Sequence, residues 1–487
     1  MSKSGQLEAL DKAPLGRLLF AYSWPALVAM ALNSLYAVVD RFYIGSGCGE
    51  SAMAALTLSF PVVMIFIAFG VWVGMGHSAL LSIKLGEGNR VAAEKILGEM
   101  LALKTLFFFL LLPPVLYFLD PLLRLSGGAE VSGETLELAK QYLRITLGAH
   151  IFSNLAFGLS AMLRSEGGAR ESMLCMLIGF GLNLVLDPLF IFSKKIEFGF
   201  AGEIHSATLG FGMGLSGAAW ATAISMIASF AWILWRYVSG RTVVRLHFSR
   251  IGIFREYLFR SLTIGLAPFL QQLMGAVVNF SLQMSLAKWA RDTNEAILNI
   301  AALGVFQATM LFFIMPVFGL QQGVSPIMGY NWGARNYARV RESLMLGLML
   351  TTIVVATASL SMFFFPDSIA RLFSDGNNPE YIKVAAKTLE VSNCMLWCIG
   401  LNISMTTFFQ SIGRPRMAIL LSMLRQGVCL VPCIWFLPCF FEDRVFGVWL
   451  ALPISDLLAC LATIPPFVLY ARFLKFADLR LYRKSAS

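Results

Sequence analysis

The chain has 487 residues, of which 57% are hydrophobic and only 14% are charged, and its mean hydropathy is +0.72. A soluble protein carries roughly a quarter charged residues, so most of this surface must face something other than water. The 38 lysine and arginine residues outnumber the 28 aspartate and glutamate residues, but they are spread over short segments between apolar runs. We therefore expect a membrane protein without a nucleic-acid partner.

Apolar runs of about 20 residues are long enough to cross a hydrocarbon core as helices. The first half of the chain has six such runs, at 18–39, 56–83, 100–119, 142–163, 173–192 and 217–237. The second half has six more, at 258–286, 300–327, 344–365, 384–409, 417–441 and 445–474. These runs predict an all-α membrane protein with about twelve transmembrane helices.

The basic residues predict how the chain is oriented, because lysine and arginine prefer cytoplasmic segments. With a cytoplasmic N-terminus, the inner segments hold 24 of these residues and the outer segments hold 8. We therefore expect a multi-pass protein with both termini in the cytoplasm. The basic loop 236–260 could also contact anionic membrane lipids, and residues 1–14 lack the apolar core of a signal peptide.

The two halves repeat one another. The pattern Ser-x-Gly-x-x-Arg occurs at 165–170 and again at 411–416, and Pro25 of the first run corresponds to Pro268 of the seventh. Two such halves predict two pseudo-symmetric six-helix lobes related by an axis along the membrane normal. The domains expected are an N-terminal lobe, a cytoplasmic linker and a C-terminal lobe, at 1–240, 241–260 and 261–487.

Acidic residues inside apolar runs are the informative exceptions, since an Asp at a membrane helix centre costs about 2.5–3.5 kcal/mol on insertion scales. Asp40 follows the first run, and Asp187 lies within the fifth, four residues after Asn183. That spacing places Asn183 and Asp187 on one helix face, where they could bind a proton or a small cation. The structural alternatives are an interfacial Asp40 paired with Arg41, and an Asp187 that caps a helix end beside Pro188.

The second half lacks these acids. Cys429 and Cys433 stand where the first half has Asn183 and Asp187, and the neutral amides Asn279 and Gln283 lie around the place that corresponds to Asp40. Asp456 is its one deep acid, and an ion pair with Arg425 is as good an explanation for it as a transport role.

The sequence does not predict a metal site or a catalytic site. The eight cysteines lie mostly within or beside apolar runs with no histidine nearby, which favours core packing over a metal site. The four histidines are scattered, and no nucleophile stands with a base to form a catalytic set. We therefore expect no enzyme activity and no catalytic residues.

Several motifs in order resemble one family. They are Pro-x7-Asn-x-x-Tyr-x-x-x-Asp at 25–40, Leu-Gly-x-Gly-Asn at 85–89, Arg-x-Glu-Gly-x-x-Arg at 164–170, Asn-x-x-x-Asp-Pro at 183–188, Pro-x-x-Gly-Tyr-Asn-x-Gly-Ala at 326–334 and Gln-x-x-Gly at 410–413. Together they resemble the multidrug and toxic compound extrusion (MATE) transporters over nearly the whole chain. The bacterial subgroup that keeps its acids in the N-terminal half is the most similar.

The resemblance implies two six-helix lobes, alternating access, and export of small organic cations in exchange for H⁺ or Na⁺. It implies a monomer in the bacterial cytoplasmic (inner) membrane, with no cofactor apart from the coupling ion. The cation-coupling positions that it implies are Asp40, Asn183, Asp187 and Thr222, of which the first three could also hold Na⁺. A substrate cavity is expected among Tyr36, Tyr142, Ser160, Gln271, Gln272, Asn279, Gln283 and Gln307.

The alternative is a flippase for lipid-linked saccharides from a related family. Such proteins typically line a central cavity with several cationic residues. The apolar runs here hold few cations, chiefly Arg144 and Arg425, and this argues for the exporter.

Overall fold

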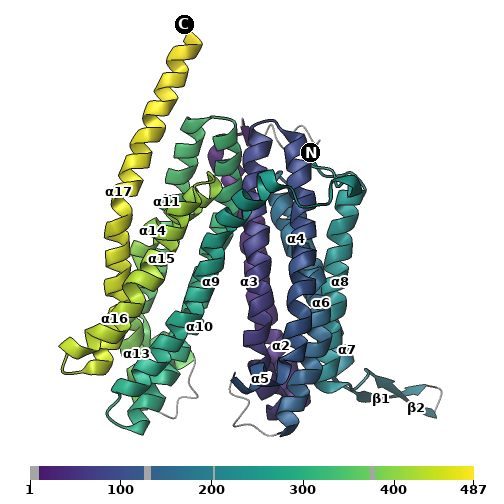
Figure 1. Cartoon of the computed structure of the whole chain (residues 1–487). Helices are drawn as coiled ribbons and strands as arrows, with labels where there is room; N and C mark the ends of the chain where they lie inside the picture. The colour runs from purple at the N-terminus through teal and green to yellow at the C-terminus, as the bar shows by residue number, and fades with distance from the viewer. Residues whose placement is uncertain (1–9, 12, 126–132, 201–202, 373–378, 487) are drawn as a thin grey trace. The chain divides into compact units, whose positions relative to one another are not determined.

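The computed structural model describes residues 10–11, 13–125, 133–200, 203–372 and 379–486 (Figure 1). Long helices make up nearly all of this part of the chain, so the expected all-α membrane fold is confirmed. In the first half the elements are α2 (Leu15–Cys48), α3 (Glu50–Gly86), α4 (Arg90–Tyr117), α5 (Leu119–Leu123), α6 (Gly133–Ser165), α7 (Ala169–Ile191), β1 (Lys194–Phe200), β2 (Glu203–Leu209) and α8 (Gly214–Val238).

The second half continues the same pattern with more interruptions. After the short 3₁₀ turn η2 (Phe248–Arg250), its elements are α9 (Arg255–Trp289), α10 (Thr293–Gly333), α11 (Tyr337–Phe364), α12 (Pro366–Leu372), α13 (Pro379–Ser392), η3 (Leu396–Cys398), α14 (Ile399–Ser411), α15 (Pro415–Met423), the π-helical η4 (Leu424–Leu430), α16 (Val431–Phe436), η5 (Leu437–Phe440) and α17 (Arg444–Ala486).

Within the described residues, eleven helices are long and apolar enough to span a membrane. The tenth predicted run, 384–409, is not one long helix but is divided between α13, η3 and α14. At the break, the Asn393 side chain donates to Leu389 O at 2.8 Å, and the Asn393 carbonyl accepts from Ser359 Oγ at 2.6 Å. These bonds replace helical ones, because Asn side chains compete with the backbone for hydrogen bonds.

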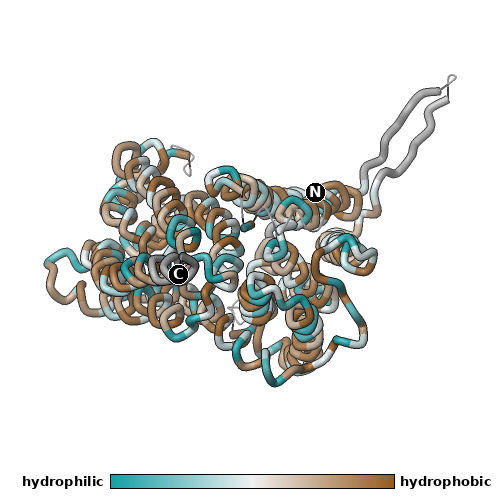
Figure 2. The backbone as a smooth tube through the Cα atoms, turned by 90° about the horizontal axis from the view of Figure 1, so that it is seen from above, coloured by the Kyte–Doolittle hydropathy of each residue, from teal (hydrophilic) through white to brown (hydrophobic). Residues whose placement is uncertain are grey.

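The surfaces of the helices are apolar to an extent that water would not tolerate. Phe109 of α4 is 61% exposed and Phe312 of α10 is 71% exposed. Figure 2 shows hydrophobic segments on several sides of individual helices. A helix that is hydrophobic all round suits a lipid environment, which explains why so little of the chain is charged.

The described chain forms two compact units. Unit 1 contains Val28–Ser78 and Arg90–Leu258, and unit 2 contains the described parts of Leu7–Leu27, Ala79–Asn89 and Phe259–Ser487. In unit 1, α6 and α7 both pack against α8, and α4 packs against α6. In unit 2, α10 packs against α11 and α13, and α17 packs against α11 and α14.

The segment after α8 is held on unit 1 by buried carboxylates. The Val244 amide donates to Glu166 Oε2 at 2.7 Å, and the Phe254 amide donates to Glu99 Oε1 at 2.8 Å. Glu166 follows α6, and Glu99 lies in α4. The segment that joins the two halves of the sequence is therefore folded against unit 1 as far as Leu258.

A two-stranded hairpin follows α7. Strands β1 and β2 pair antiparallel with Lys194 opposite Leu209 and Phe200 opposite Glu203. The mixed composition of this stretch gives no clear strand pattern, so the hairpin was not predicted and the stretch was expected to be a loop outside the spans.

Candidate functional site

A cavity of about 390 Å³ lies within unit 1. Helices α2, α3, α6, α7 and α8 contribute its walls, which are mainly apolar with a few polar groups. The polar lining residues are Asn33, Tyr36, His150, Ser153, Asn154, Ser160, Asn183, Thr222, Ser225 and Ser229. A cavity of this size and character suits a small organic molecule.

Asn183 and Asp187 meet beside this cavity as their spacing predicts. Asn183 Nδ2 donates to Asp187 Oδ1 at 2.9 Å, and only 1% of Asp187 is exposed. Asp187 lies inside α7, before its last residue Ile191, so it does not cap a helix end. The alternative interpretation of Asp187 as a cap is therefore wrong.

The second acid comes from a different helix. The Asp40 carboxyl group of α2 is hydrogen-bonded to that of Asp187. A hydrogen bond between two carboxyl groups requires one proton, because an ionised carboxylate can only accept and a protonated carboxyl group must donate. The pair therefore forms a site where one proton or one small cation can lie between two acids.

One polar atom at this site has no partner among the described residues. Asn183 Oδ1 is buried and accepts no hydrogen bond, while Asn183 Nδ2 also approaches Thr222 Oγ1 at 3.5 Å. A buried acceptor without a donor costs about 1–3 kcal/mol. A bound cation or a protonated group would satisfy it, as oxygen ligands of this kind suit hard cations.

The aromatic residues predicted for this region lie close to the acids. Tyr36 of α2 stacks on Phe180 with ring centroids 5.3 Å apart and interacts with Thr222 through a side-chain hydrogen bond. Tyr142 of α6 is within electrostatic range of both acids. Ser160 lines the cavity and shares a 2.6 Å hydrogen bond with Ser172 Oγ.

The remaining predicted cavity residues lie in unit 2. Gln283 Nε2 donates to Asn279 Oδ1 at 2.7 Å on α9. Gln271 and Gln272 lie on α9, and Gln307 lies on α10. These amides are therefore not part of the cavity in unit 1.

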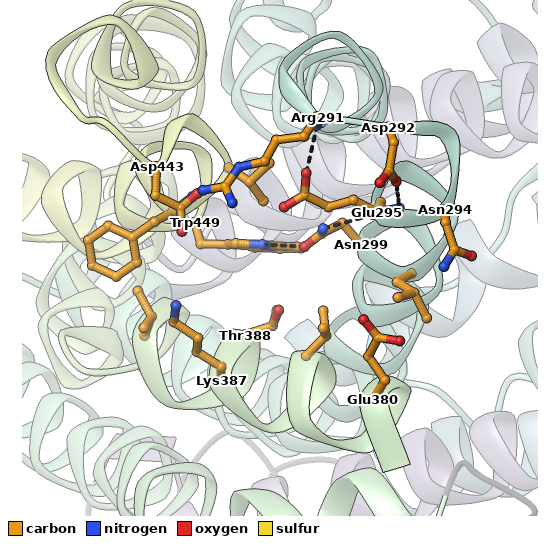
Figure 3. Close-up of a pocket in the computed structure, with 15 residues that line it drawn as sticks. Arg291, Asp292, Asn294, Glu295, Asn299, Glu380, Lys387, Thr388, Asp443 and Trp449 are labelled. Carbon is orange, nitrogen blue, oxygen red and sulfur yellow. Dashed lines mark hydrogen bonds between the residues drawn. The ribbon is translucent and has the colours of Figure 1, made fainter. Parts of the chain in front are cut away.

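Unit 2 has a cavity of its own, of about 320 Å³ (Figure 3). It has acidic residues in its walls, but several of them have structural roles. Asp292 accepts from the Glu295 amide at 2.7 Å at the start of α10, and Asp443 accepts from the Phe446 amide at 3.1 Å near the start of α17. Such acids are stabilised at helix N-termini, so they do not by themselves indicate a ligand.

Asp456 is paired with Arg425. Arg425 Nε donates to Asp456 Oδ1 at 2.8 Å, and the Asp456 side chain is only 4% exposed. Arg425 belongs to the π-helical segment η4. The ion pair expected between Asp456 and Arg425 is therefore present.

Two buried cations in unit 1 were not predicted from the sequence. Lys104 of α4 is 4% exposed, and Arg164 of α6 is 5% exposed and donates to Ser172 Oγ at 2.7 Å. The expectation that Arg144 and Arg425 are the chief cations of the apolar runs is therefore wrong. Lys104 is a single lysine in the apolar run 100–119. Because intramembrane charges are rare, it could have been predicted from the sequence as a buried cation.

Comparison with known proteins shows that both halves of this chain match the same protein family. A family model described as MatE matches residues 25–189 and again residues 269–436. The two matches begin near Pro25 and Pro268, the positions that the internal repeat aligned. The multidrug export protein MepA of Staphylococcus aureus (strain MSSA476) is 25% identical over 465 residues, which is 94% of this chain and 95% of MepA.

Solved structures share the fold. The MATE multidrug transporter DinF-BH has a TM-score of 0.80 at 30% identity and covers 93% of this chain and 95% of its own. An outward-facing multidrug resistance MATE family transporter of the MOP superfamily has a TM-score of 0.84 at 23% identity, covering 96% and 98%. This chain therefore belongs to the MatE family of multidrug and toxic compound extrusion transporters.

Proposed function

We propose that the protein exports small organic cations across the membrane in exchange for H⁺ or Na⁺. The observation that carries this proposal is the acid pair of Asp40 and Asp187 with the unpartnered Asn183 Oδ1 beside it. Relatives and solved structures named for multidrug export or multidrug transport support the substrate class.

The mechanism follows from competition for one charged site. The acid pair shares one proton and keeps one negative charge. When it takes up a second proton or Na⁺, that charge is neutralised and a bound organic cation loses its attraction. When the ion leaves toward the side where it is scarce, the carboxylate is free to attract the next organic cation. Exchange of one organic monocation for one H⁺ or Na⁺ moves no net charge across the membrane, so the concentration gradient of the coupling ion drives it. Each tenfold step of that gradient supplies about 1.4 kcal/mol.

We propose the two six-helix lobes as the moving parts of alternating access, with lobe boundaries at 1–240 and 261–487. The protein would act as a monomer in the bacterial cytoplasmic membrane with both termini inside. The excess of basic residues on the proposed inner side supports that orientation. Anionic lipid headgroups would contact the basic segment after α8.

The experiment is efflux of a fluorescent organic cation from proteoliposomes, driven by a pH gradient and by a Na⁺ gradient in separate runs. We expect Asp187→Asn and Asp40→Asn each to lower efflux at least tenfold, because one acid alone cannot share the ion. Asp367→Asn, an exposed acid at the start of α12, is the matched control and should leave efflux unchanged.

Full efflux in both acid variants would overturn the proposal. The gradient that drives wild-type efflux identifies the coupling ion. Transfer of a lipid-linked saccharide, without movement of the dye, would favour the flippase instead.

A further inference from the structure

Lys104 lies in the middle of α4 with only 4% of its surface exposed. Its Nζ donates to the backbone carbonyl of Asn154 on α6 at 2.6 Å. The same ammonium lies over the Phe157 ring, 5.4 Å from the ring centroid. A buried ammonium can use a carbonyl and an aromatic face in this way, but neither group neutralises its charge.

The neighbouring helices make room for this lysine. A Cβ added to Gly74 of α3 would lie 3.2 Å from Lys104 Nζ, and one added to Gly158 of α6 would lie 2.8 Å from Lys104 Cε. Both distances are shorter than ordinary van der Waals contact. Glycines on two helices therefore define the space that Lys104 fills.

Within the described part of the chain, the charge of Lys104 is not paired with an acid. Among the ion pairs of the described residues, none joins Lys104 to a carboxylate. Burying an unpaired cation is costly, and a retained intramembrane charge points to a function. The proposed ion site does not use this group.

The position of Lys104 relative to the cavity indicates what that function is. Asn154 and Phe157, the two residues described above as interacting with the ammonium, both line the 390 Å³ cavity of unit 1. The ammonium therefore lies directly behind residues of the cavity wall. Charges interact over longer distances in a low-dielectric interior than in water, so this cation acts on the contents of the cavity without touching them.

We propose that Lys104 determines the charge selectivity of the cavity and excludes organic dications while admitting monocations. The acid pair of Asp40 and Asp187 attracts one positive charge, and Lys104 repels a second. This inference rests on the proposed function, because it concerns the substrates of the same cavity. It goes beyond that function because it assigns the upper limit on the charge of the substrate to Lys104.

The competing explanation is that Lys104 only fills space between α3, α4 and α6. In that case, replacing Lys104 would lower the binding affinity for all ligands by a similar factor. A ratio of affinities for two ligands of different charge separates the two explanations, since a general packing defect cancels in the ratio.

The experiment measures binding of two phenanthridinium dyes, the monocation ethidium and the dication propidium, to the purified full-length protein in detergent. We expect Lys104→Met to shift the ratio of the two dissociation constants about tenfold in favour of propidium. Lys104→Gln, which keeps a donor for the Asn154 carbonyl, should shift it in the same direction. Arg144→Gln removes an exposed cation of α6 and should leave the ratio unchanged.

An unchanged ratio in both folded Lys104 variants would overturn the inference, and so would an equal shift in Arg144→Gln. If the wild-type protein bound neither dye, the proposed substrate class would fail together with the selectivity that depends on it. Binding of both dyes with an unchanged ratio would overturn only the role of Lys104.

Discussion

Glu166 accepts a 2.7 Å hydrogen bond from the backbone amide of Val244, and this bond ties the corner between α6 and α7 to the segment after α8. The other carboxylate oxygen of Glu166 accepts from Tyr237 Oη at 2.8 Å. Burial raises the pKa of Glu166 from 4.5 to about 7, although both hydrogen bonds favour the ionised form. The segment that joins the halves of the chain is therefore held by a carboxyl group whose pKa is raised to about 7.

Glu166→Gln is expected to remove part of the pH dependence of stability. The folded chain holds the Glu166 proton more tightly than the unfolded chain, so this group contributes stability below pH 4.5 that is lost as the pH rises through about 7. The loss is on the order of 3 kcal/mol, from 1.36 kcal/mol per pKa unit. Thermal unfolding in detergent should show Glu166→Gln gaining stability relative to wild type between pH 5 and pH 8.

The matched control is Glu342→Gln, because Glu342 of α11 is exposed. Its difference from wild type should stay constant over that pH range. A constant difference for Glu166→Gln as well would contradict the assignment of the titration to Glu166.

Gly98→Ala is expected to loosen the segment after α8. A Cβ at Gly98 would lie 2.0 Å from the backbone carbonyl oxygen of Arg250, and backbone cannot move aside as a flexible side chain can. Overpacking of this kind typically costs about 1–3 kcal/mol. The midpoint of thermal unfolding should therefore fall.

Gly148→Ala in α6 is the comparison, because a Cβ there has nothing within 4 Å. This change should be neutral or stabilising by up to about 1 kcal/mol, since Ala favours helix over Gly. Equal midpoints for the two alanine variants would argue against the close approach of Arg250 to α4.

Asp456→Asn should destabilise unit 2 by about 3 kcal/mol, because it leaves the Arg425 cation without its partner in a largely buried site. The double variant Asp456→Leu, Arg425→Leu should recover most of that loss, since an apolar pair needs no compensation. Thermal unfolding of the three proteins measures both steps. A double variant that is less stable than Asp456→Asn would contradict a purely structural role for the pair.

The variants Asn183→Leu and Thr222→Val are expected to differ in their loss of efflux, because Asn183 and Thr222 are proposed to contribute unequally to binding of the coupling ion. Asn183 bonds Asp187 at 2.9 Å and has the unpartnered Oδ1, whereas Thr222 is reached only at 3.5 Å. We therefore expect at least a tenfold loss of efflux for Asn183→Leu and less than a threefold loss for Thr222→Val. An equal loss in both, measured in proteoliposomes, would make Thr222 a full ligand.

Local sequence patterns explain which contacts could be predicted without the structure. The i, i+4 spacing of Asn183 and Asp187 places both on one face of any α-helix, so their contact needed no tertiary information. The partnership of Asp456 with Arg425 could be suggested because a buried acid requires a nearby cation and the second half offers few. The break at Asn393 was missed, because hydropathy continues across it and only the contact with Ser359 shows where the helix stops.

The sequence by itself determined the class of this protein, its two repeated halves and its family, because length, hydropathy and motif order are properties of the chain alone. Only the tertiary structure decided that Asp40 meets Asp187, that Glu166 holds Val244, and that Lys104 is buried behind the cavity wall. These three relationships join segments far apart in the chain. Their contacts depend on how helices cross and rotate against one another, and periodicity within a single helix does not specify that.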